Sequence, residues 1–338
     1  MTKLQSIAQQ MTQKGKGILA ADESTPTCNK RFDSVGVSSS FENRNEYRDL
    51  LITANGMEEY IGGVIMFDET LRQSTTCDKK VLFPDYLKSK GVVPGIKVDK
   101  GAKNLAGFNN EKITEGLDGL RERLKEYYKL GARFTKWRGV YIISKNSPSD
   151  LAKTSNAHAL ARYSALAQEC GMVPIVEPEV LMDGNHTAED CMVITSDVLK
   201  KCFDELIHNK IDLKGIVLKP NMILPGSSSN QKLSTQEIAE MTLECLKKNV
   251  PSEVPSVAFL SGGQSEEEAT KNLNTINKIN NTNFSMTFSY GRALQQSALK
   301  VWSKNTKDIE ATQNTFNHRA KMCTLAAQGK WSHELENK

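Results

Sequence analysis

The chain has 338 residues, the length of one large α/β barrel or of about two smaller domains. Its hydrophobic fraction of 38% and charged fraction of 25% exclude wholesale disorder, a collagen-like repeat and a coiled coil. A net charge of +4 from 44 basic and 40 acidic residues is too small to indicate nucleic acid as the main partner.

The seven cysteines are scattered and contain no CxxC pair, and the five histidines form no HxH, HxxH or HExxH group. This pattern is typical of reduced thiols and argues against a zinc site. A Mg²⁺ ion bound by carboxylates alone is not excluded, but no motif in the sequence indicates one. No apolar run is long enough for a membrane helix, and the first 17 residues lack the apolar core of a signal peptide. We therefore expect a cytoplasmic protein without a membrane partner.

Eight short apolar runs of strand length recur along the chain, each closed by a polar residue. They are continuous rather than alternating, as expected for strands that are covered on both faces. In chain order they are 18–22, 63–68, 94–99, 132–138, 173–179, 215–219, 257–261 and 285–290.

Helical patterns lie between most of these runs. Ser234 and Glu237 form a capping box at one helix start, and three glutamates open the helix that follows Ser265. The predicted helices are 42–60, 115–130, 155–169, 188–208, 235–248, 265–279, 293–302 and 312–328.

Eight strands that alternate with helices predict a (β/α)8 TIM barrel of the α/β class. We expect one domain over residues 1–338, with an N-terminal helical extension and a short C-terminal tail. The alternative is two smaller α/β domains, but no Pro/Gly/Ser-rich linker divides the middle of the chain.

Charged or polar residues close these runs, and in such a barrel the chemistry collects at the carboxyl ends of the strands. Any one of these charged residues alone would ordinarily be interpreted as a solvent-exposed residue at the end of a strand. Together they predict one polar cavity. Its expected residues are Asp22, Asp68, Lys97, Asp99, Lys136, Arg138, Glu177, Glu179, Lys219, Ser261 and Arg292.

Two features of this set indicate its chemistry. Lys219 follows an apolar strand and precedes Pro220, and a desolvated lysine near a second cation such as Lys136 can attack a carbonyl to form an imine. Glu177 and Glu179 lie two residues apart and so point to the same face, where one carboxyl group could carry a proton. A structural ion pair is the alternative for these glutamates.

The cations of the cavity match an anionic substrate, most simply a phosphorylated one. The loops after the last two strands frequently form the phosphate site of a barrel. Here they contain Ser261-Gly262-Gly263 and Tyr290-Gly291-Arg292.

At this point the chain resembles the class I, Schiff-base-forming fructose-1,6-bisphosphate aldolases. The resemblance runs in order from about residue 1 to Trp331. It rests on the segments GKGILAADEST (15–25), GIKVDKG (95–101), AGFNNE (106–111), LDGLRER (117–123), KWR (136–138), IVEPEVLMDGNH (175–186), LKPNM (218–222), FLSGGQSEEEAT (259–270) and FSYGRALQ (288–295).

The resemblance implies cleavage of fructose 1,6-bisphosphate to dihydroxyacetone phosphate and glyceraldehyde 3-phosphate in glycolysis and gluconeogenesis, without metal or other cofactor. It implies that Lys219 forms the Schiff base and that Glu177 carries protons, with Glu179 beside it. Asp22 would accept the C4 hydroxyl proton, and Lys136 would balance the charge.

The resemblance also implies two phosphate sites and the partners of the chain. The 1-phosphate would meet Ser261, Gly262, Gly263, Tyr290, Gly291 and Arg292. The 6-phosphate would meet Lys97, Arg138 and Arg31, with Ser24 or Thr27. The implied partners are a phosphorylated ketose, further copies of the chain in a homotetramer, and a cytoskeletal protein such as actin.

Two departures from the family pattern concern the first loop and the tail. Pro26-Thr27 stand where the family has Gly-Ser, so we expect a reshaped loop. No Tyr follows Tyr290, whereas family tails end in a Tyr that exchanges the carbon proton of the enamine. We therefore expect slow enamine protonation, with His333 as the nearest alternative donor.

Two alternative functions are considered, one with a different substrate and one without catalysis. A weaker 6-phosphate site would favour a sugar monophosphate such as fructose 1-phosphate. A binding or scaffold protein would be expected to lose Lys219 or Glu177, and both are present.

Overall fold

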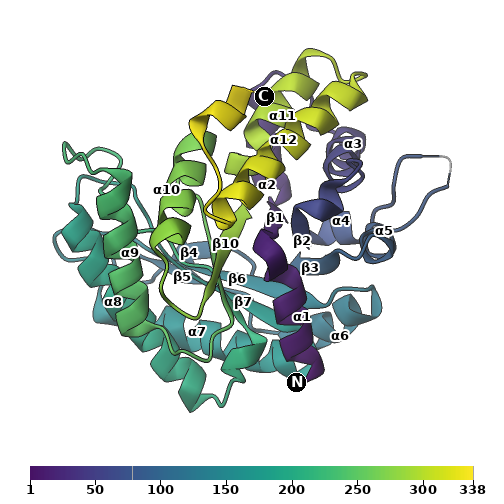
Figure 1. The fold of residues 1–338 in the computed structure, drawn as a ribbon. Coiled ribbons are helices and arrows are strands. Elements are labelled where there is room, and N and C mark those ends of the chain that lie inside the picture. The colour runs from purple at the N-terminus through teal and green to yellow at the C-terminus, as the bar shows by residue number, and fades with distance from the viewer. Residues whose placement is uncertain (78, 338) are drawn as a thin grey trace.

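Eight parallel strands form a closed barrel in the computed structural model, and helices surround it (Figure 1). The structure describes residues 1–77 and 79–337. Every predicted strand run overlaps one barrel strand, so the predicted (β/α)8 barrel is confirmed. The barrel strands are β1 (Gly17–Ala21), β2 (Ile61–Met66), β3 (Val93–Lys97), β6 (Phe134–Tyr141), β7 (Val173–Val180), β8 (Val217–Leu218), β9 (Ser256–Phe259) and β10 (Ser285–Tyr290).

The helices cover the outside of the barrel and one of its ends. The α-helices are α1 (Lys3–Thr12), α2 (Thr25–Asp33), α3 (Phe41–Ile52), α4 (Asp68–Leu71), α5 (Phe83–Ser89), α6 (Leu120–Lys129), α7 (Asp150–Glu169), α8 (Ala188–His208), α9 (Thr235–Asn249), α10 (Glu266–Ile279), α11 (Arg292–Lys304) and α12 (Ile309–Ala327). Short 3₁₀ turns occupy Gln13–Gly15, Met57–Glu59, Leu213–Gly215 and His333–Asn337.

Two predicted helices are longer than the observed ones, and a glycine explains each difference. The helix expected over 42–60 ends at Ile52, before Gly56 takes a left-handed φ of 83°. The helix expected from 115 begins at Leu120, after Gly119 takes a φ of 65°. Such backbone conformations interrupt a right-handed helix.

Four features of the described residues were not predicted. The first three are the short helices α2, α4 and α5. Helix α2 lies between β1 and β2, and α4 and α5 lie between β2 and β3. The fourth is an antiparallel hairpin of β4 (Ala102–Asn104) and β5 (Lys112–Thr114) between β3 and α6. Its strands of three residues are too short to give a periodic pattern.

Two apolar layers explain why the strand sequences are continuously hydrophobic. Inward-pointing strand residues, among them Ile18, Val173 and Val217, form the barrel interior. Their neighbours, such as Leu19 and Leu218, pack outward against the helices. Because side chains alternate along a strand, each strand residue belongs to one layer or the other.

Helix α1 closes the amino-terminal end of the barrel. Its Ile7, Ala8 and Met11 are buried against the interior layer. Gly62 on β2 lies so close to this helix that an added Cβ would sit 2.3 Å from the Met11 carbonyl oxygen. The carboxyl end of the barrel is left open for a site. No helix within the described residues is long and apolar enough to cross a membrane.

Candidate active site

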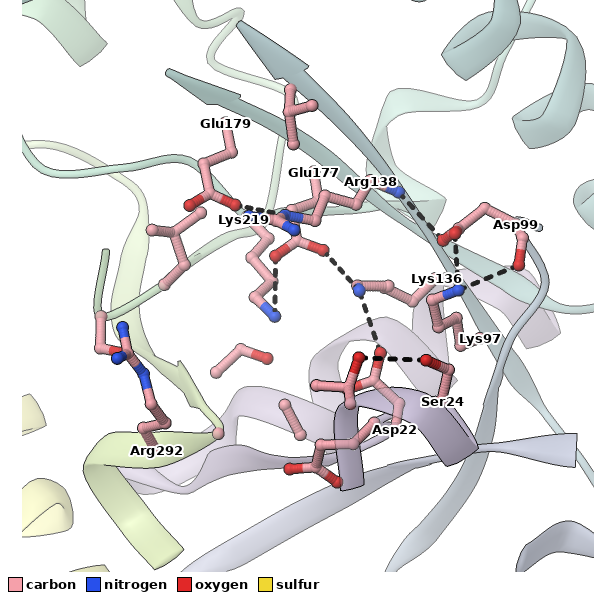
Figure 2. Close-up of a pocket in the computed structure, with 18 of the residues that line it drawn as sticks. Asp22, Ser24, Lys97, Asp99, Lys136, Arg138, Glu177, Glu179, Lys219 and Arg292 are labelled. Atoms are coloured by element: carbon pink, nitrogen blue, oxygen red, sulfur yellow. Dashed lines mark hydrogen bonds and ion pairs between the residues drawn. The ribbon is translucent and has the colours of Figure 1, made fainter. Parts of the chain in front are cut away.

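A polar cavity of about 360 Å³ lies at the carboxyl ends of the barrel strands (Figure 2). This volume lies in the range of pockets that hold small molecules. The cavity brings together most of the residues that the sequence predicts for one site. These are Asp22, Ser24, Arg31, Lys97, Asp99, Lys136, Arg138, Glu177, Glu179, Lys219, Ser261, Gly262, Gly263, Gly291 and Arg292.

The alternation of side chains along the strands explains why these residues meet. Lys219 lies two residues after the inward Val217, and Glu177 lies two residues after the inward Ile175. Lys136 in the same way follows Phe134. Each charged side chain therefore continues the inward face of its strand at the point where the apolar interior ends.

A chain of charges crosses the floor of the cavity. Glu177 Oε1 lies 3.0 Å from Lys219 Nζ, and Glu177 Oε2 lies 3.0 Å from Lys136 Nζ. Lys136 Nζ also donates to Asp22 Oδ2 at 2.9 Å. All four side chains are buried, and Figure 2 shows them as one connected line. Two carboxylates and two amines thus alternate, so each carboxylate has a cationic neighbour.

This alternation sets the ionisation of the buried groups. Burial alone would raise the pKa of Asp22, but the ammonium groups of Lys136 and Lys219 outweigh it and lower the pKa. The same opposition lowers the pKa of Glu177. Burial alone would lower the pKa of Lys136, but Asp22 and Glu177 raise it well above its usual value. Asp22 and Glu177 are therefore carboxylates and Lys136 is an ammonium group.

Glu179 lies beside this line and holds Arg138. The guanidinium Nε donates to Glu179 Oε2 at the side of the cavity. Glu179 thereby has a different partner from Glu177, although both point from β7 into one site. Glu177 is therefore paired with two lysines, whereas Glu179 is paired with an arginine.

Lys97 and Asp99 form a second ion pair on the same side as Arg138, with Nζ 2.6 Å from Oδ1. Asp99 Oδ1 also accepts from the backbone N–H of Gly101 at 3.0 Å, where the chain turns into the β4–β5 hairpin. The Asp99 side chain thus fixes both the ammonium group and the loop beside it.

Ser24 and Thr27 lie at the start of α2, and both line the cavity. Their hydroxyl oxygens are 3.0 Å apart. Pro26 lies in the first turn of α2, where a missing backbone N–H is tolerated. The expected reshaping of this loop is therefore small enough to keep two hydroxyl groups at the cavity wall.

The other end of the cavity consists of the loops after β9 and β10. Gly262 and Gly263 take φ values of 55° and 86°, and a Cβ at Gly263 would lie 2.8 Å from Met182 Sδ. Gln264 Nε2 donates to the Ser261 carbonyl at 2.8 Å and holds this loop. Arg292 begins α11, where the first backbone N–H groups of the helix have no partner within the helix. In Figure 2, Arg292 lies on the opposite side of Lys219 from Lys97 and Asp99.

Arg31, on α2, lines the cavity and approaches the loop after β10. Its Nη2 is 3.6 Å from the position that a Cβ on Gly291 would take. The sequence predicts Arg31 among the 6-phosphate residues, together with Thr27 four residues earlier on α2, and which phosphate it meets stays a prediction. Because Arg31 comes from α2, only the packing of that helix against the end of β10 decides which loop it joins.

Two predicted residues, Tyr290 and Asp68, do not line the cavity. Each follows, two residues later, a strand residue whose side chain points outward to the helices. Tyr290 continues the outward Phe288, is fully buried, and donates its hydroxyl to the Ala269 carbonyl at 3.1 Å. Asp68 starts α4 and pairs with Arg72 at 3.1 Å. The inward neighbour Ser289 lines the cavity in place of Tyr290.

His333 is likewise outside the cavity. Its Nδ1 lies 2.6 Å from Glu267 Oε1 on α10, and its side chain is exposed. The tail is held by Glu336, which pairs with Arg319 and accepts from Trp331 Nε1 at 2.7 Å. The structure thus gives His333 a surface ion pair and no contact with the cavity residues.

Comparisons with known proteins give the family to which this chain belongs. The family model described as fructose-bisphosphate aldolase class-I, of the glycolytic type, matches residues 3–338. The chain belongs to the class I fructose-bisphosphate aldolases. The family suggested by the sequence motifs is thereby confirmed.

Its relatives in this family include bacterial and plant proteins. A probable fructose-bisphosphate aldolase class 1 of Xanthomonas axonopodis pv. citri is 49% identical over 330 residues, which cover 97% of this chain and 98% of the relative. The cytosolic fructose-bisphosphate aldolase 4 of Arabidopsis thaliana is 51% identical over 323 residues, covering 95% and 82%. A solved fructose-bisphosphate aldolase of Plasmodium falciparum, in a complex with TRAP and a small-molecule inhibitor, has a TM-score of 0.95 and 46% identity, covering 98% and 95%.

Glu23 is a charged residue of this cavity that the sequence did not predict. It follows Asp22 directly and lines the same cavity. Glu23 is in the register of the strand residues that point outward to the helices, and a charged residue in that register is ordinarily not part of a site. The sequence therefore provides no reason to include it. Its burial beside two arginines is visible only in the fold.

The described residues contain no group of three or more His, Cys, Asp or Glu side chains arranged to hold a metal ion. The carboxylates of the cavity are instead each paired with lysine or arginine. The ammonium and guanidinium groups thus occupy the places that a cation would need.

Proposed function

We propose that the cavity cleaves fructose 1,6-bisphosphate through an imine on Lys219, which gives the aldolase activity of the family a definite set of residues. The observation that carries this proposal is a buried amine 3.0 Å from a carboxylate at the floor of a cationic cavity. A carbonyl group that reaches Lys219 meets a nucleophile and a proton carrier at once.

Glu177 provides the proton transfers of imine formation. Its Oε1 accepts a proton from the Lys219 ammonium group, and the free amine attacks C2 of the ketose. A proton moves from the nitrogen of the adduct to the C2 oxygen, which gives a neutral carbinolamine. Lys136 still lowers the pKa of Glu177, but the second lowering charge, that of Lys219, is gone, so the carboxyl group can carry the proton. Glu177 then protonates the C2 hydroxyl group, which leaves as water, and a protonated imine remains.

Asp22 acts on the C4 hydroxyl group. The charged Asp22 carboxylate accepts the hydroxyl proton, the C3–C4 bond breaks, and its electron pair moves into the imine to form an enamine. Glyceraldehyde 3-phosphate leaves, and protonation of the enamine followed by hydrolysis releases dihydroxyacetone phosphate. Lys136 lies between Asp22 and Glu177 and balances whichever of them is negative.

The two ends of the cavity bind the two phosphates. Ser261, Gly262, Gly263, Gly291 and Arg292 meet the 1-phosphate, and the position of Arg31 beside Gly291 adds it to this group. Lys97, Arg138, Ser24 and Thr27 meet the 6-phosphate at the opposite end. Cations at both ends support a bisphosphate over a monophosphate substrate.

The proposal also includes the oligomeric state of the protein and its location in the cell. We expect a homotetramer, which sedimentation velocity would test. We also expect a cytoplasmic enzyme. The name of the cytosolic Arabidopsis relative supports this location, although a relative from Chlamydomonas reinhardtii is named chloroplastic.

Borohydride trapping tests the central residue. Reduction in the presence of dihydroxyacetone phosphate should attach the substrate carbon chain to one lysine, which peptide mapping by mass spectrometry identifies. The Lys219→Ala variant should not be labelled, and the Lys214→Ala variant, which removes an exposed lysine near β8, should be labelled like the native chain. Labelling of Lys219→Ala at the native level would show that another amine forms the imine.

A further inference from the structure

A buried ion-pair network lies behind the 1-phosphate end of the cavity, at the end of β1. Its centre is Glu23, the residue after Asp22. Leu19 and Ala21 belong to the outward layer of β1, and Glu23 continues their parity. Its side chain is only 6% exposed and contacts the helices α2, α3 and α11. A carboxylate in such a place needs several partners.

Helices α3 and α11 hold Glu23 from behind. Arg48 Nη2 lies 3.0 Å from Glu23 Oε2 and 3.1 Å from the Glu23 carbonyl oxygen. Arg48 Nη1 donates to Thr70 Oγ1 at 2.5 Å, and the arginine side chain is 1% exposed. Gln295 Nε2 donates to Glu23 Oε1 at 3.1 Å and to the Ala20 carbonyl at 2.8 Å. The carboxylate is therefore fixed in one orientation.

Arg31 approaches the same carboxylate from the cavity side. Its Nη1 donates to Glu23 Oε1, while Nη2 lies close to Gly291. The Arg31 side chain is 26% exposed and lines the cavity. One nitrogen of the guanidinium group is thus held by Glu23, and the other faces the loop that carries Arg292.

The charges of this network do not cancel. Arg31 and Arg48 carry two positive charges against the one negative charge of Glu23, so the network keeps a net charge of +1. A pair of Glu23 with Arg31 alone would be neutral and would attract a phosphate less. The buried Arg48 supplies the charge that Glu23 would otherwise remove.

We propose that Glu23, held by Arg48, is a positioning residue that fixes the Arg31 guanidinium group at the 1-phosphate end of the cavity. The proposal rests on the proposed function in placing a phosphate beside Arg31 and Arg292. Glu23 acts through Arg31 and does not itself contact the reacting carbons. Because a phosphate contact is the same before and during bond cleavage, its loss should raise KM and leave kcat unchanged.

The test compares Glu23→Gln with the native enzyme. The amide has nearly the same shape but keeps one oxygen, which can accept from only one of the two arginines, so Arg31 and Arg48 are no longer both held. We expect KM for fructose 1,6-bisphosphate and the inhibition constant of inorganic phosphate to rise about tenfold, the size of a coupling within one salt-bridge network. We expect kcat to stay within about twofold.

A matched control and a double variant separate positioning from loss of structure. Glu69→Gln removes the partner of Arg44, which donates to Glu69 at 2.8 and 2.7 Å from the same helix α3 but does not line the cavity. This control should leave KM unchanged. In the Arg31→Ala background, where the arginine to be positioned is absent, Glu23→Gln should raise KM no further.

Three results would overturn the inference, and they are distinguishable. An unchanged KM in a folded Glu23→Gln variant would show that Arg31 needs no support. A full rise of KM in the Arg31→Ala background would give Glu23 a role of its own. An unchanged KM in Arg31→Ala alone would remove Arg31 from the phosphate site, which refutes that part of the proposed function. If Glu23→Gln does not fold, Glu23→Asp tests the same points, because it keeps the charge for Arg48 and withdraws the carboxylate from Arg31.

Discussion

Lys136→Met is the change that tests the charge alternation at the cavity floor most directly. Methionine has a similar length and removes only the ammonium group, which lies 2.9 Å from Asp22 Oδ2 and 3.0 Å from Glu177 Oε2. Lys219 still neutralises Glu177 in the variant, because its Nζ is 3.0 Å from the other oxygen. Asp22 loses its nearest cation and is the group most affected.

The structure gives the size of the effect. Two unit charges about 3 Å apart attract by about 5–6 kcal/mol at an effective dielectric constant of about 20. Removal of one partner from a buried pair costs about 3–5 kcal/mol, because the remaining charge stays desolvated. The pKa of Asp22, which the lysines now hold below its usual value, must rise. The acidic limb of the pH–rate profile should therefore move upward by about one to three pH units.

The assay is kcat/KM for fructose 1,6-bisphosphate as a function of pH. Below the new pKa, Asp22 is protonated and cannot accept the C4 hydroxyl proton, so we expect the contribution of this base, about 10²- to 10⁴-fold, to be lost on the acidic side of that pKa, where the native enzyme keeps it. Lys153→Met removes a lysine that pairs with Asp197 outside the barrel and serves as the control. An unchanged acidic limb in folded Lys136→Met would refute the assignment of Lys136 as the group that keeps Asp22 charged.

Two further predictions concern the metal and the 6-phosphate. Full activity should persist in EDTA, because the protonated imine on Lys219 accepts the electron pair, and a loss that Zn²⁺ restores would contradict this mechanism. Lys97→Ala should raise KM for fructose 1,6-bisphosphate about tenfold or more and leave KM for fructose 1-phosphate unchanged, since a hydrogen bond to a charged group contributes about 1.5–3 kcal/mol. Lys103→Ala, on the hairpin outside the cavity, is its control, and equal rises for both ketoses would argue against a 6-phosphate at Lys97.

The sequence predicted the barrel and the floor of the cavity because both follow from short-range patterns. Continuous apolar runs predict strands that are covered on both faces, and the structure confirms all eight. Lys219, Glu177 and Lys136 each lie two residues beyond an inward apolar side chain. A strand has a period of two, so a polar residue in that register must point into the barrel.

Other features depend on contacts between distant segments and could not be predicted in this way. Arg31 belongs to a short helix that gives no strong periodic signal, and only the packing of α2 against the end of β10 places it beside Gly291. The partners of Glu23 come from α3 and α11, 25 and 272 residues away. No local pattern connects them, whereas the family resemblance located each motif but not these contacts.

Tyr290 shows how the same alternation corrects a prediction and yields another. The sequence predicts Tyr290 in the phosphate loop because it precedes Gly291-Arg292. Phe288 and Tyr290 share the outward layer of β10, so the phenol ring packs among the helices and its hydroxyl donates to the Ala269 carbonyl at 3.1 Å. Burial raises the pKa of the phenol well above its usual value, so the group stays neutral.

Tyr290→Phe should therefore change stability and not catalysis. The variant keeps the buried ring and loses one hydrogen bond between neutral groups, which contributes about 1 kcal/mol to the free energy of unfolding. Urea denaturation should show this loss as a lower midpoint with an unchanged slope. KM for fructose 1,6-bisphosphate and for fructose 1-phosphate should equal the native values, because Ser289 and Gly291, and not Tyr290, line the cavity. A rise of either KM without a loss of stability would mean that the hydroxyl group reaches the substrate and that the outward parity of Tyr290 does not hold in the working enzyme.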